Sequence, residues 1–466
     1  MFLSQEEDDH FSLLKFESML KTNKVLFFDS SEFENIIHYY LEEGKINLAK
    51  KALKLGLTQH PTSVDLRLFQ VEIYVFEEKL ELAEKLINEL QAIEHFNEEI
   101  HIQKANILSK KGCHQEAVKE LQTALEMTED EADIYSMLGM EYLFVENFEE
   151  AKNCFEKCLE LDPEDFSALY NIVYCFEFLE KTDEAIRFLN GFIEKNPYSE
   201  IAWHQLGRQF ASIGMLHEAI RAYDFANLID ENFTGAYLEK GKVLEELKRY
   251  REAIQNYKIT LTLDDPSSFA LLSIGRCYEK INKPKLAIRH YKEAVHIDPL
   301  LDKGWKAITK FHFKYKNYPK ALEAIQKAIN LDGENSHYWK LAARIHTVLA
   351  QYEQAVEAYA KAISLGNYKL STWLELADLL ILVNESEFAL EQLLLAEPLF
   401  PNKSKISYRL AGLYFTLNNE EKAEFYLLQS LALNPENISV IQSIFPDFFK
   451  SLKLSQILND FKNGMQ

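Results

Sequence analysis

Small and apolar residues recur along this 466-residue chain in a pattern that repeats every 34 residues. Alanine marks the period most plainly, at twelve positions without an insertion or deletion: Ala49, Ala83, Ala117, Ala151, Ala185, Ala219, Ala253, Ala287, Ala321, Ala355, Ala389 and Ala423. Within residues 132–165, two sets of side chains each follow one face of an α-helix. These sets are Tyr135, Leu138 and Tyr142, and then Ala151, Phe155 and Cys158. Each period therefore predicts a pair of helices.

The residues around the alanine predict how the two helices of a pair meet and end. With the alanine numbered position 20, twelve repeats run from Ser30 to Asn437. Position 8 holds glycine in several repeats: Gly139, Gly207, Gly241 and Gly275. Small residues at positions 8 and 20 let two helices cross closely. Proline near position 32 ends the second helix in six repeats: Pro61, Pro163, Pro197, Pro299, Pro401 and Pro435. Because one pair cannot bury its apolar face alone, the copies are expected to stack into one elongated all-α solenoid.

The pattern resembles the tetratricopeptide repeat, which has W-x2-L-G-x2-Y in its first helix and A-x3-F followed by P in its second, at a period of 34 residues. The resemblance covers residues 30–437 and implies a right-handed α-α superhelix of twelve repeats. Two departures stand out. Position 8 is bulky in the first two repeats, at Ile37 and Val71, and six repeats lack proline at position 32.

The segments outside the repeats are expected to cover the exposed ends of the stack. Terminal units of a solenoid need atypical caps with a polar outer face. We therefore expect residues 1–29 to form an N-terminal capping segment and residues 438–466 to form C-terminal capping helices.

The net charge of −22 is concentrated in one half of the chain. Residues 1–233 hold 21 Lys and Arg against 46 Asp and Glu (21 − 46 = −25), whereas residues 234–466 hold 30 against 27 (30 − 27 = +3). The acidic balance disfavours double-stranded nucleic acid, which requires a broad basic surface. No apolar run approaches the roughly 20 residues that a membrane span needs, so no membrane insertion is expected. Five scattered cysteines and an acidic start without signal-peptide features favour a cytoplasmic protein with reduced thiols.

A row of cations occupies one position in five consecutive repeats. The resemblance implies that the first helices line a concave groove through positions 2, 5, 6, 9, 12 and 13. Position 9 carries Arg208, Lys242, Arg276, Lys310 and Arg344, and positions 2 and 5 add Lys303, Lys306 and Lys340. Packed helices lie about 8–10 Å apart, close to one Debye length at physiological salt, so these charges repel one another. The row predicts binding of an acidic segment, and the alternative is a solvated face.

The fourth and fifth repeats carry apolar residues at the same groove positions. The set is Met137, Met140, Phe144, Tyr170, Tyr174 and Phe178. Exposed apolar groups on a concave wall typically mark an interaction site, and methionine and aromatic side chains adapt well to peptide side chains. The alternative is that the superhelix or the acidic N-terminal segment covers them.

No pattern in the sequence indicates catalysis or a bound cofactor. Phosphate-binding glycine loops, zinc-ligand spacings and nucleophile elbows are absent, so we expect no catalytic residue, metal or cofactor. The family's carboxylate clamp for peptide C-termini is incomplete, because Leu341, Ser371 and Glu375 replace its later residues. We therefore predict a non-enzymatic scaffold that binds a protein or an extended peptide with an acidic segment. The alternative is a structural component that self-associates, or joins a larger complex, through its ends or acidic outer face. The sequence leaves the partner's identity and the oligomeric state open.

Overall fold

The computed structural model describes residues 12–21, 26–94, 96–128, 130–263 and 267–450, together with 456, 457 and 460. The chain divides into two compact units, residues 1–236 and 237–466, with the boundary inside helix α14. Residues 234–236 are uncharged, so the charge asymmetry of the sequence falls on these two units. Each unit is described by itself.

The predicted all-α fold is confirmed, because every regular element in the described residues is helical. The first helices of the pairs are α2 (Ser30–Glu42), α4 (Val64–Phe76), α6 (Glu98–Lys110), α8 (Ala132–Phe144), α10 (Phe166–Phe178), α12 (Glu200–Ser212), α14 (Thr234–Glu246), α16 (Ser268–Lys280), α18 (Asp302–Lys314), α20 (Ser336–Val348), α22 (Leu370–Leu382) and α24 (Ser404–Thr416). The second helices are α3 (Ile46–Gln59), α5 (Leu80–Ile93), α7 (His114–Leu125), α9 (Phe148–Leu161), α11 (Thr182–Lys195), α13 (Leu216–Ile229), α15 (Tyr250–Leu263), α17 (Pro284–Ile297), α19 (Tyr318–Leu331), α21 (Tyr352–Ser364), α23 (Ser386–Ala396) and α25 (Glu420–Leu433).

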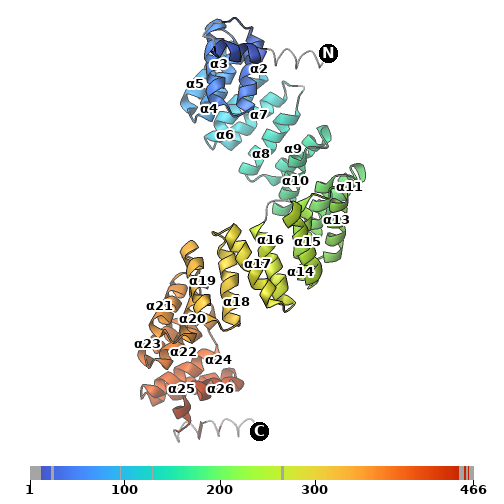
Figure 1. The fold of residues 1–466 in the computed structure, drawn as a ribbon. Helices are drawn as coiled ribbons and strands as arrows, with labels where there is room; N and C mark the ends of the chain where they lie inside the picture. The colour runs from blue at the N-terminus through green and yellow to red at the C-terminus, as the bar shows by residue number, and fades with distance from the viewer. Residues whose placement is uncertain are drawn as a thin grey trace. The chain divides into compact units, whose positions relative to one another are not determined.

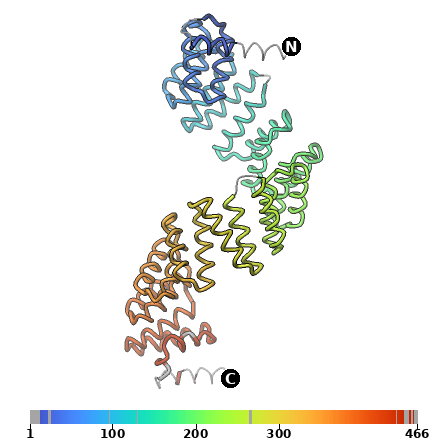
Figure 2. Tube along the Cα trace, in the orientation of Figure 1, coloured from blue at the N-terminus to red at the C-terminus, as the bar shows by residue number. Residues whose placement is uncertain are grey.

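Within each unit, the helices stack in the order of the sequence (Figure 1). Each first helix other than α14 packs on its own second helix, and most second helices pack on the next first helix. The Cα trace in Figure 2 shows the same hairpin following hairpin within each unit. Among the described helices, none combines the length and apolar character of a membrane-crossing segment.

The ends of the chain are only partly described. Residues 12–21 are helical, and Phe16 and Met19 are buried beside the first helix pair. After the last pair come η1 (Pro435–Ile438), α26 (Ser439–Ile444) and η2 (Pro446–Lys450). The remaining parts of the expected capping segments lie outside the described residues, so their capping role stays a prediction.

The last residue of each repeat explains where the next first helix begins. In six repeats, the side chain at position 34 accepts a hydrogen bond from a backbone N–H in the first turn of the following helix. These N-cap residues are Ser63, Asn97, Asp165, Ser199, Ser267 and Asn335. Such caps satisfy backbone donors that the helix leaves unpaired.

Position 15 closes the turn inside each pair with a left-handed backbone. Glycine supplies it at Gly44, Gly112 and Gly214, with φ between 66° and 77°. In the other repeats, non-glycine residues adopt φ between 55° and 64°: Glu78, Glu146, Glu180, Lys248, Asn282, Lys316, Ala350, Asn384 and Asn418. A side chain in this conformation meets the following carbonyl, which costs about 1–2 kcal/mol per residue.

The two helices of each pair meet at positions 8, 20 and 24. All twelve position-20 alanines are fully buried. Where position 8 is glycine, the aromatic ring at position 24 lies directly over it: a methyl group added to Gly207 would lie 2.5 Å from Tyr223 Cε1, and one added to Gly139 would lie 2.6 Å from Phe155 Cε1. The small residues predicted from the sequence therefore let a large ring fill the crossing.

A glycine-to-alanine substitution tests this crossing. We expect Gly207→Ala to lower the melting temperature, because overpacking a buried contact costs about 1–3 kcal/mol and exceeds the roughly 1 kcal/mol gained in helix propensity. Gly191→Ala in α11 is the matched control, since nothing lies within 4 Å of the added methyl group. Gly191→Ala is expected to raise the melting temperature, and a rise in both variants would contradict the close crossing.

The position-15 turn gives a second stability prediction. Ala350→Gly is expected to raise the urea midpoint, because glycine adopts this left-handed backbone without the penalty of about 1 kcal/mol or more. Ala360→Gly, at an exposed position inside α21, should lower the midpoint by a similar amount. Equal shifts in the same direction would show that position 15 is not strained.

Candidate functional site

We call the side of each unit on which first helices of neighbouring repeats meet the first-helix face; in unit 2, ion pairs join α14 to α16 and α20 to α22. In unit 1, α2 contacts α4, α4 contacts α6, and α10 contacts α12. Most of the residues that line two pockets between first helices come from positions 2, 5, 6, 9, 12 and 13, the positions at which both sequence-predicted sets of residues stand.

An exposed apolar surface lies on α8 and α10 in unit 1. Five side chains, which we call the apolar patch, are between 39% and 58% exposed: Met140, Phe144, Tyr170, Tyr174 and Phe178. Met137 is half-buried against the core instead. Within the described residues, no segment of the chain covers the five exposed side chains.

Ring contacts hold the apolar patch in a fixed arrangement. The rings of Tyr174 and Phe178 have centroids 4.6 Å apart, and Phe148 stacks on Phe178 at 4.8 Å. Phe144 stacks on His114 at 4.6 Å. Aromatic pairs of this kind add about 0.5–1.5 kcal/mol beyond area burial, so Phe144, Tyr174 and Phe178 are held in place by neighbouring rings before any partner binds.

Four of the five position-9 cations have a carboxylate partner. In unit 1, Arg208 Nη2 lies 3.4 Å from Glu177 Oε1. In unit 2, Arg276 Nη2 lies 3.2 Å from Glu245 Oε1, Lys242 Nζ lies 2.6 Å from Glu239 Oε1, and Arg344 Nε lies 3.8 Å from Glu375 Oε2. The sequence interpretation missed these partners, although a spacing of 31 residues links three of the pairs.

The unpaired positive charge gathers on repeat 9. Within the described residues, Lys303, Lys306 and Lys310 have no ion-pair partner. Burial lowers the pKa of Lys306, and the nearby Lys310 lowers it further. Burial likewise lowers the pKa of His337, followed by the charges of Lys369 and Lys306. The row is therefore not uniform, because the lysines without an ion pair to the described residues lie on repeat 9, where Asp302 acts against the lowering of the Lys306 pKa.

A pocket of 380 Å³ adjoins this positive region on the first-helix face of unit 2. Its walls include Phe313, Val348 and Leu382, and its polar lining includes Arg344 and Glu375. Lys340 also reaches Glu375, with Nζ 3.7 Å from Oε1. The pocket combines an apolar wall with one cation, Arg344, and two carboxylates, Glu375 and Asp378.

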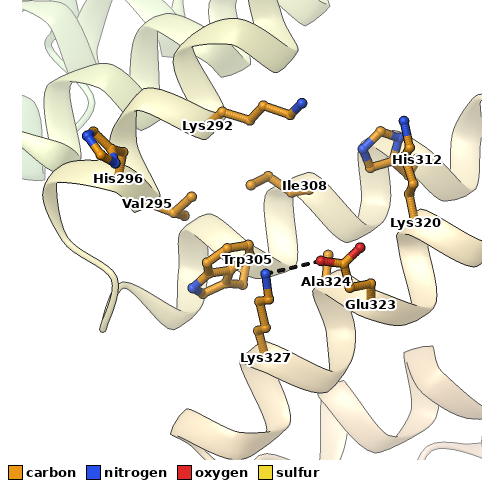
Figure 3. Close-up of a pocket in the computed structure, with 10 residues that line it drawn as sticks. All are labelled: Lys292, Val295, His296, Trp305, Ile308, His312, Lys320, Glu323, Ala324 and Lys327. Atoms are coloured by element: carbon orange, nitrogen blue, oxygen red, sulfur yellow. Dashed lines mark hydrogen bonds and ion pairs between the residues drawn. The ribbon is translucent and has the colours of Figure 1, made fainter.

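A second pocket in unit 2, of 410 Å³, lies between α17, α18 and α19 (Figure 3). Lys327 Nζ lies 4.5 Å from the ring centroid of Trp305 and 3.2 Å from Glu323 Oε1. Trp305 Nε1 donates to the Pro299 carbonyl at 3.0 Å. Because Trp203 and Trp339 donate to the residue six positions earlier in the same way, this tryptophan contact belongs to repeat packing.

No metal site accompanies these surfaces. Among the described residues, no three His, Cys, Asp or Glu side chains are grouped so that they could hold a metal ion.

Comparison with known proteins identifies the type of repeat in this chain. Family models described as tetratricopeptide repeat match residues 132–165, 167–199, 238–301 and 404–437. The first and last of these ranges coincide with the fourth and twelfth repeats defined by the alanine period.

Two similar proteins are much longer than the segments that match. The tetratricopeptide repeat-containing protein trd-1 of Caenorhabditis elegans is 23% identical over 204 residues, which is 44% of this chain and 25% of that protein. Anaphase-promoting complex subunit 3 of Schizosaccharomyces pombe is 24% identical over 140 residues, which is 30% of this chain and 21% of that protein. Among solved structures, a chain of the APC/C hetero-tetramer Cut9–Hcn1 is 13% identical, with a TM-score of 0.37, over 95% of this chain and 94% of that chain.

The charge distribution in repeats 7–9 predicts opposite effects for two charge reversals. Lys310→Glu is expected to raise the melting temperature, because it replaces repulsion of Lys306 by attraction. Arg276→Glu is expected to lower it, because it places a carboxylate against Glu245. Both shifts should shrink at about 1 M salt, where the Debye length falls to about 3 Å. Thermal melts at two salt concentrations check this, and shifts of the same sign would contradict it.

Proposed function

Because the chain belongs to the tetratricopeptide repeat family, we propose that it is a non-enzymatic scaffold whose first-helix faces bind segments of a partner protein. A relative named as a subunit of the anaphase-promoting complex supports a role in protein assembly. The proposed partner carries an apolar segment that binds unit 1 and an acidic segment that binds unit 2.

The apolar patch is the observation that carries the proposal. Large apolar side chains on neighbouring helices, stacked and accessible, are a costly surface to leave in water, and such patches mark interaction sites. Aromatic side chains dominate the binding energy of most protein interfaces. Tyr174 and Phe178 are the proposed anchors, with Met140, Phe144 and Tyr170 around them and Met137 beneath.

The acidic segment of the partner is proposed to bind at repeats 9 and 10. Lys303, Lys306 and Lys310 form no ion pair with the described residues, although Asp302 lies near enough to Lys306 to raise its pKa. Lys340 and Arg344 share Glu375 and supply the rest of the positive charge. The other cations of the row, Arg208, Lys242 and Arg276, have carboxylates of their own and contribute less.

Selection from a displayed library of random 12-residue peptides tests the function without knowledge of the natural partner. Selection on the wild-type chain should enrich peptides with aromatic or aliphatic residues, acidic residues, or both. The Tyr174→Ser/Phe178→Ser variant should bind the enriched apolar peptides about 30-fold more weakly. This corresponds to a combined loss of about 2 kcal/mol of binding free energy over the two anchors. Its helicity should be unchanged.

Charge-reversal variants complete the test. Lys310→Glu should weaken binding of the enriched acidic peptides, and binding should also weaken as salt rises. Arg289→Glu makes the same charge change on α17, where the side chain is 71% exposed and paired with Glu293, and should leave binding unchanged. Failure of the wild-type chain to enrich any sequence would contradict the proposal. Self-association that depends on Tyr174 and Phe178 would favour the structural alternative.

A further inference from the structure

A separate pocket of 200 Å³ lies on the first-helix face of repeats 1–3 in unit 1. We call it the acidic pocket, because four carboxylates line it: Glu34 from α2, Asp65 and Glu72 from α4, and Glu99 from α6. The other lining residues are Leu68, Phe69 and Gln103. The three helices pack side by side, so the pocket is built by the fold itself.

The acidic pocket holds more hydrogen-bond acceptors than donors. Gln103 is only 6% exposed, and its Nε2 donates to Glu99 Oε1 at 2.8 Å. Its Oε1 is buried and has no hydrogen-bond partner. A buried acceptor left unpaired costs about 1–3 kcal/mol, so it indicates a missing donor.

The carboxylates of the acidic pocket are also short of positive charge. Within the described part of the chain, none of the four forms an ion pair with Lys or Arg; Glu34 accepts only from Ser30 Oγ, at 3.0 Å. Burial raises the pKa of Glu72, the neighbouring Glu99 raises it further, and His38 lowers it. Burial also raises the pKa of Glu99.

The shape of the acidic pocket selects the kind of cation that it fits. The carboxylates are not grouped closely enough for one metal ion. The volume is below the roughly 300–1,000 Å³ of small-molecule sites and suits a single side chain. A guanidinium offers five N–H donors and no acceptor in a planar fork that pairs with carboxylates and stacks on aromatic rings. Phe69 provides such a ring.

We propose that the acidic pocket binds the guanidinium of an arginine side chain in the partner segment that also contacts the apolar patch. The carboxylates of Glu72 and Glu99 accept its N–H groups, and Gln103 Oε1 accepts another. This inference rests on the proposed peptide-binding function. It adds a positively charged residue to a partner that is also proposed to carry an acidic segment.

The repeat spacing sets the distance between the two contacts. From α6 to α10 there are two first-helix steps, on the order of 16–20 Å. An extended chain at about 3.3 Å per residue covers this distance in roughly five or six residues. The arginine is therefore expected about that far along the chain from the residue that occupies the apolar patch.

The test uses the full chain with Nα-acetyl-arginine methylamide as the probe. Binding of the probe is measured by ligand-observed saturation-transfer NMR. The probe should bind saturably to the wild type. The neutral citrulline analogue should not bind measurably, and the lysine analogue should bind about fivefold more weakly, because it lacks the planar fork. Equal binding of the arginine and lysine analogues would overturn the proposal.

Two conservative variants locate the binding site. Glu72→Gln should weaken arginine binding about tenfold without lowering the melting temperature, since it removes an uncompensated charge. Glu89→Gln, the same change at an exposed position of α5, should leave binding intact. If both variants bind the arginine probe like the wild type, the acidic pocket is not its site.

The apolar-patch variant separates this inference from the proposed function. Tyr174→Ser/Phe178→Ser should still bind the arginine probe, because none of its changes lies in the acidic pocket. If this variant no longer binds the selected apolar peptides but still binds the arginine probe, the result supports both the proposed function and the inference about the acidic pocket. If the wild-type chain enriches peptides but does not bind the arginine probe, only the inference about the acidic pocket is overturned.

Discussion

Two positions in every repeat decide how closely its helices approach, and the rest of the structure depends on that approach. Position 20 is a fully buried alanine throughout, and a glycine such as Gly207 at position 8 admits the ring of Tyr223. A protein interior is packed as densely as an organic crystal, so one added methyl group there displaces a whole ring. The close crossing fixes the angle of each pair, and neighbouring pairs then bring some of their first helices into contact, as with α2, α4 and α6.

The first-helix faces carry different chemistry in the two units, although the helices that build them are alike. In unit 1, an acidic pocket precedes an aromatic surface at Tyr174 and Phe178. In unit 2, three lysines that form no ion pair with the described residues lie on repeat 9, and Lys306 among them lies over the ring of Tyr338. Residues on these faces are free to vary because they take little part in the crossing. A repeat scaffold therefore separates the residues that hold it together from those that contact other molecules.

The sequence predicted the helix pairs well because their determinants are periodic. The alanines at position 20, the glycines at position 8 and the prolines near position 32 recur at fixed positions, and local backbone rules then place the helix ends. The pairing of Arg276 with Glu245 was not predicted, because it depends on where two long side chains meet between repeats. The acidic pocket was missed for another reason. Its residues come from several different positions in three repeats, so comparing one position along the chain does not collect them.

The left-handed turn at position 15 has a consequence for how such a chain diversifies. The same backbone joint is made by glycine at Gly112, by Glu146, by Lys248 and by Ala350. Its geometry is thus independent of the side chain that it carries, and the two helices of every repeat are joined by an equivalent connection. A 34-residue repeat is in this sense a cassette: one copy can be exchanged, duplicated or lost in phase with its neighbours, and the binding specificity of the chain can be recomposed without a new fold.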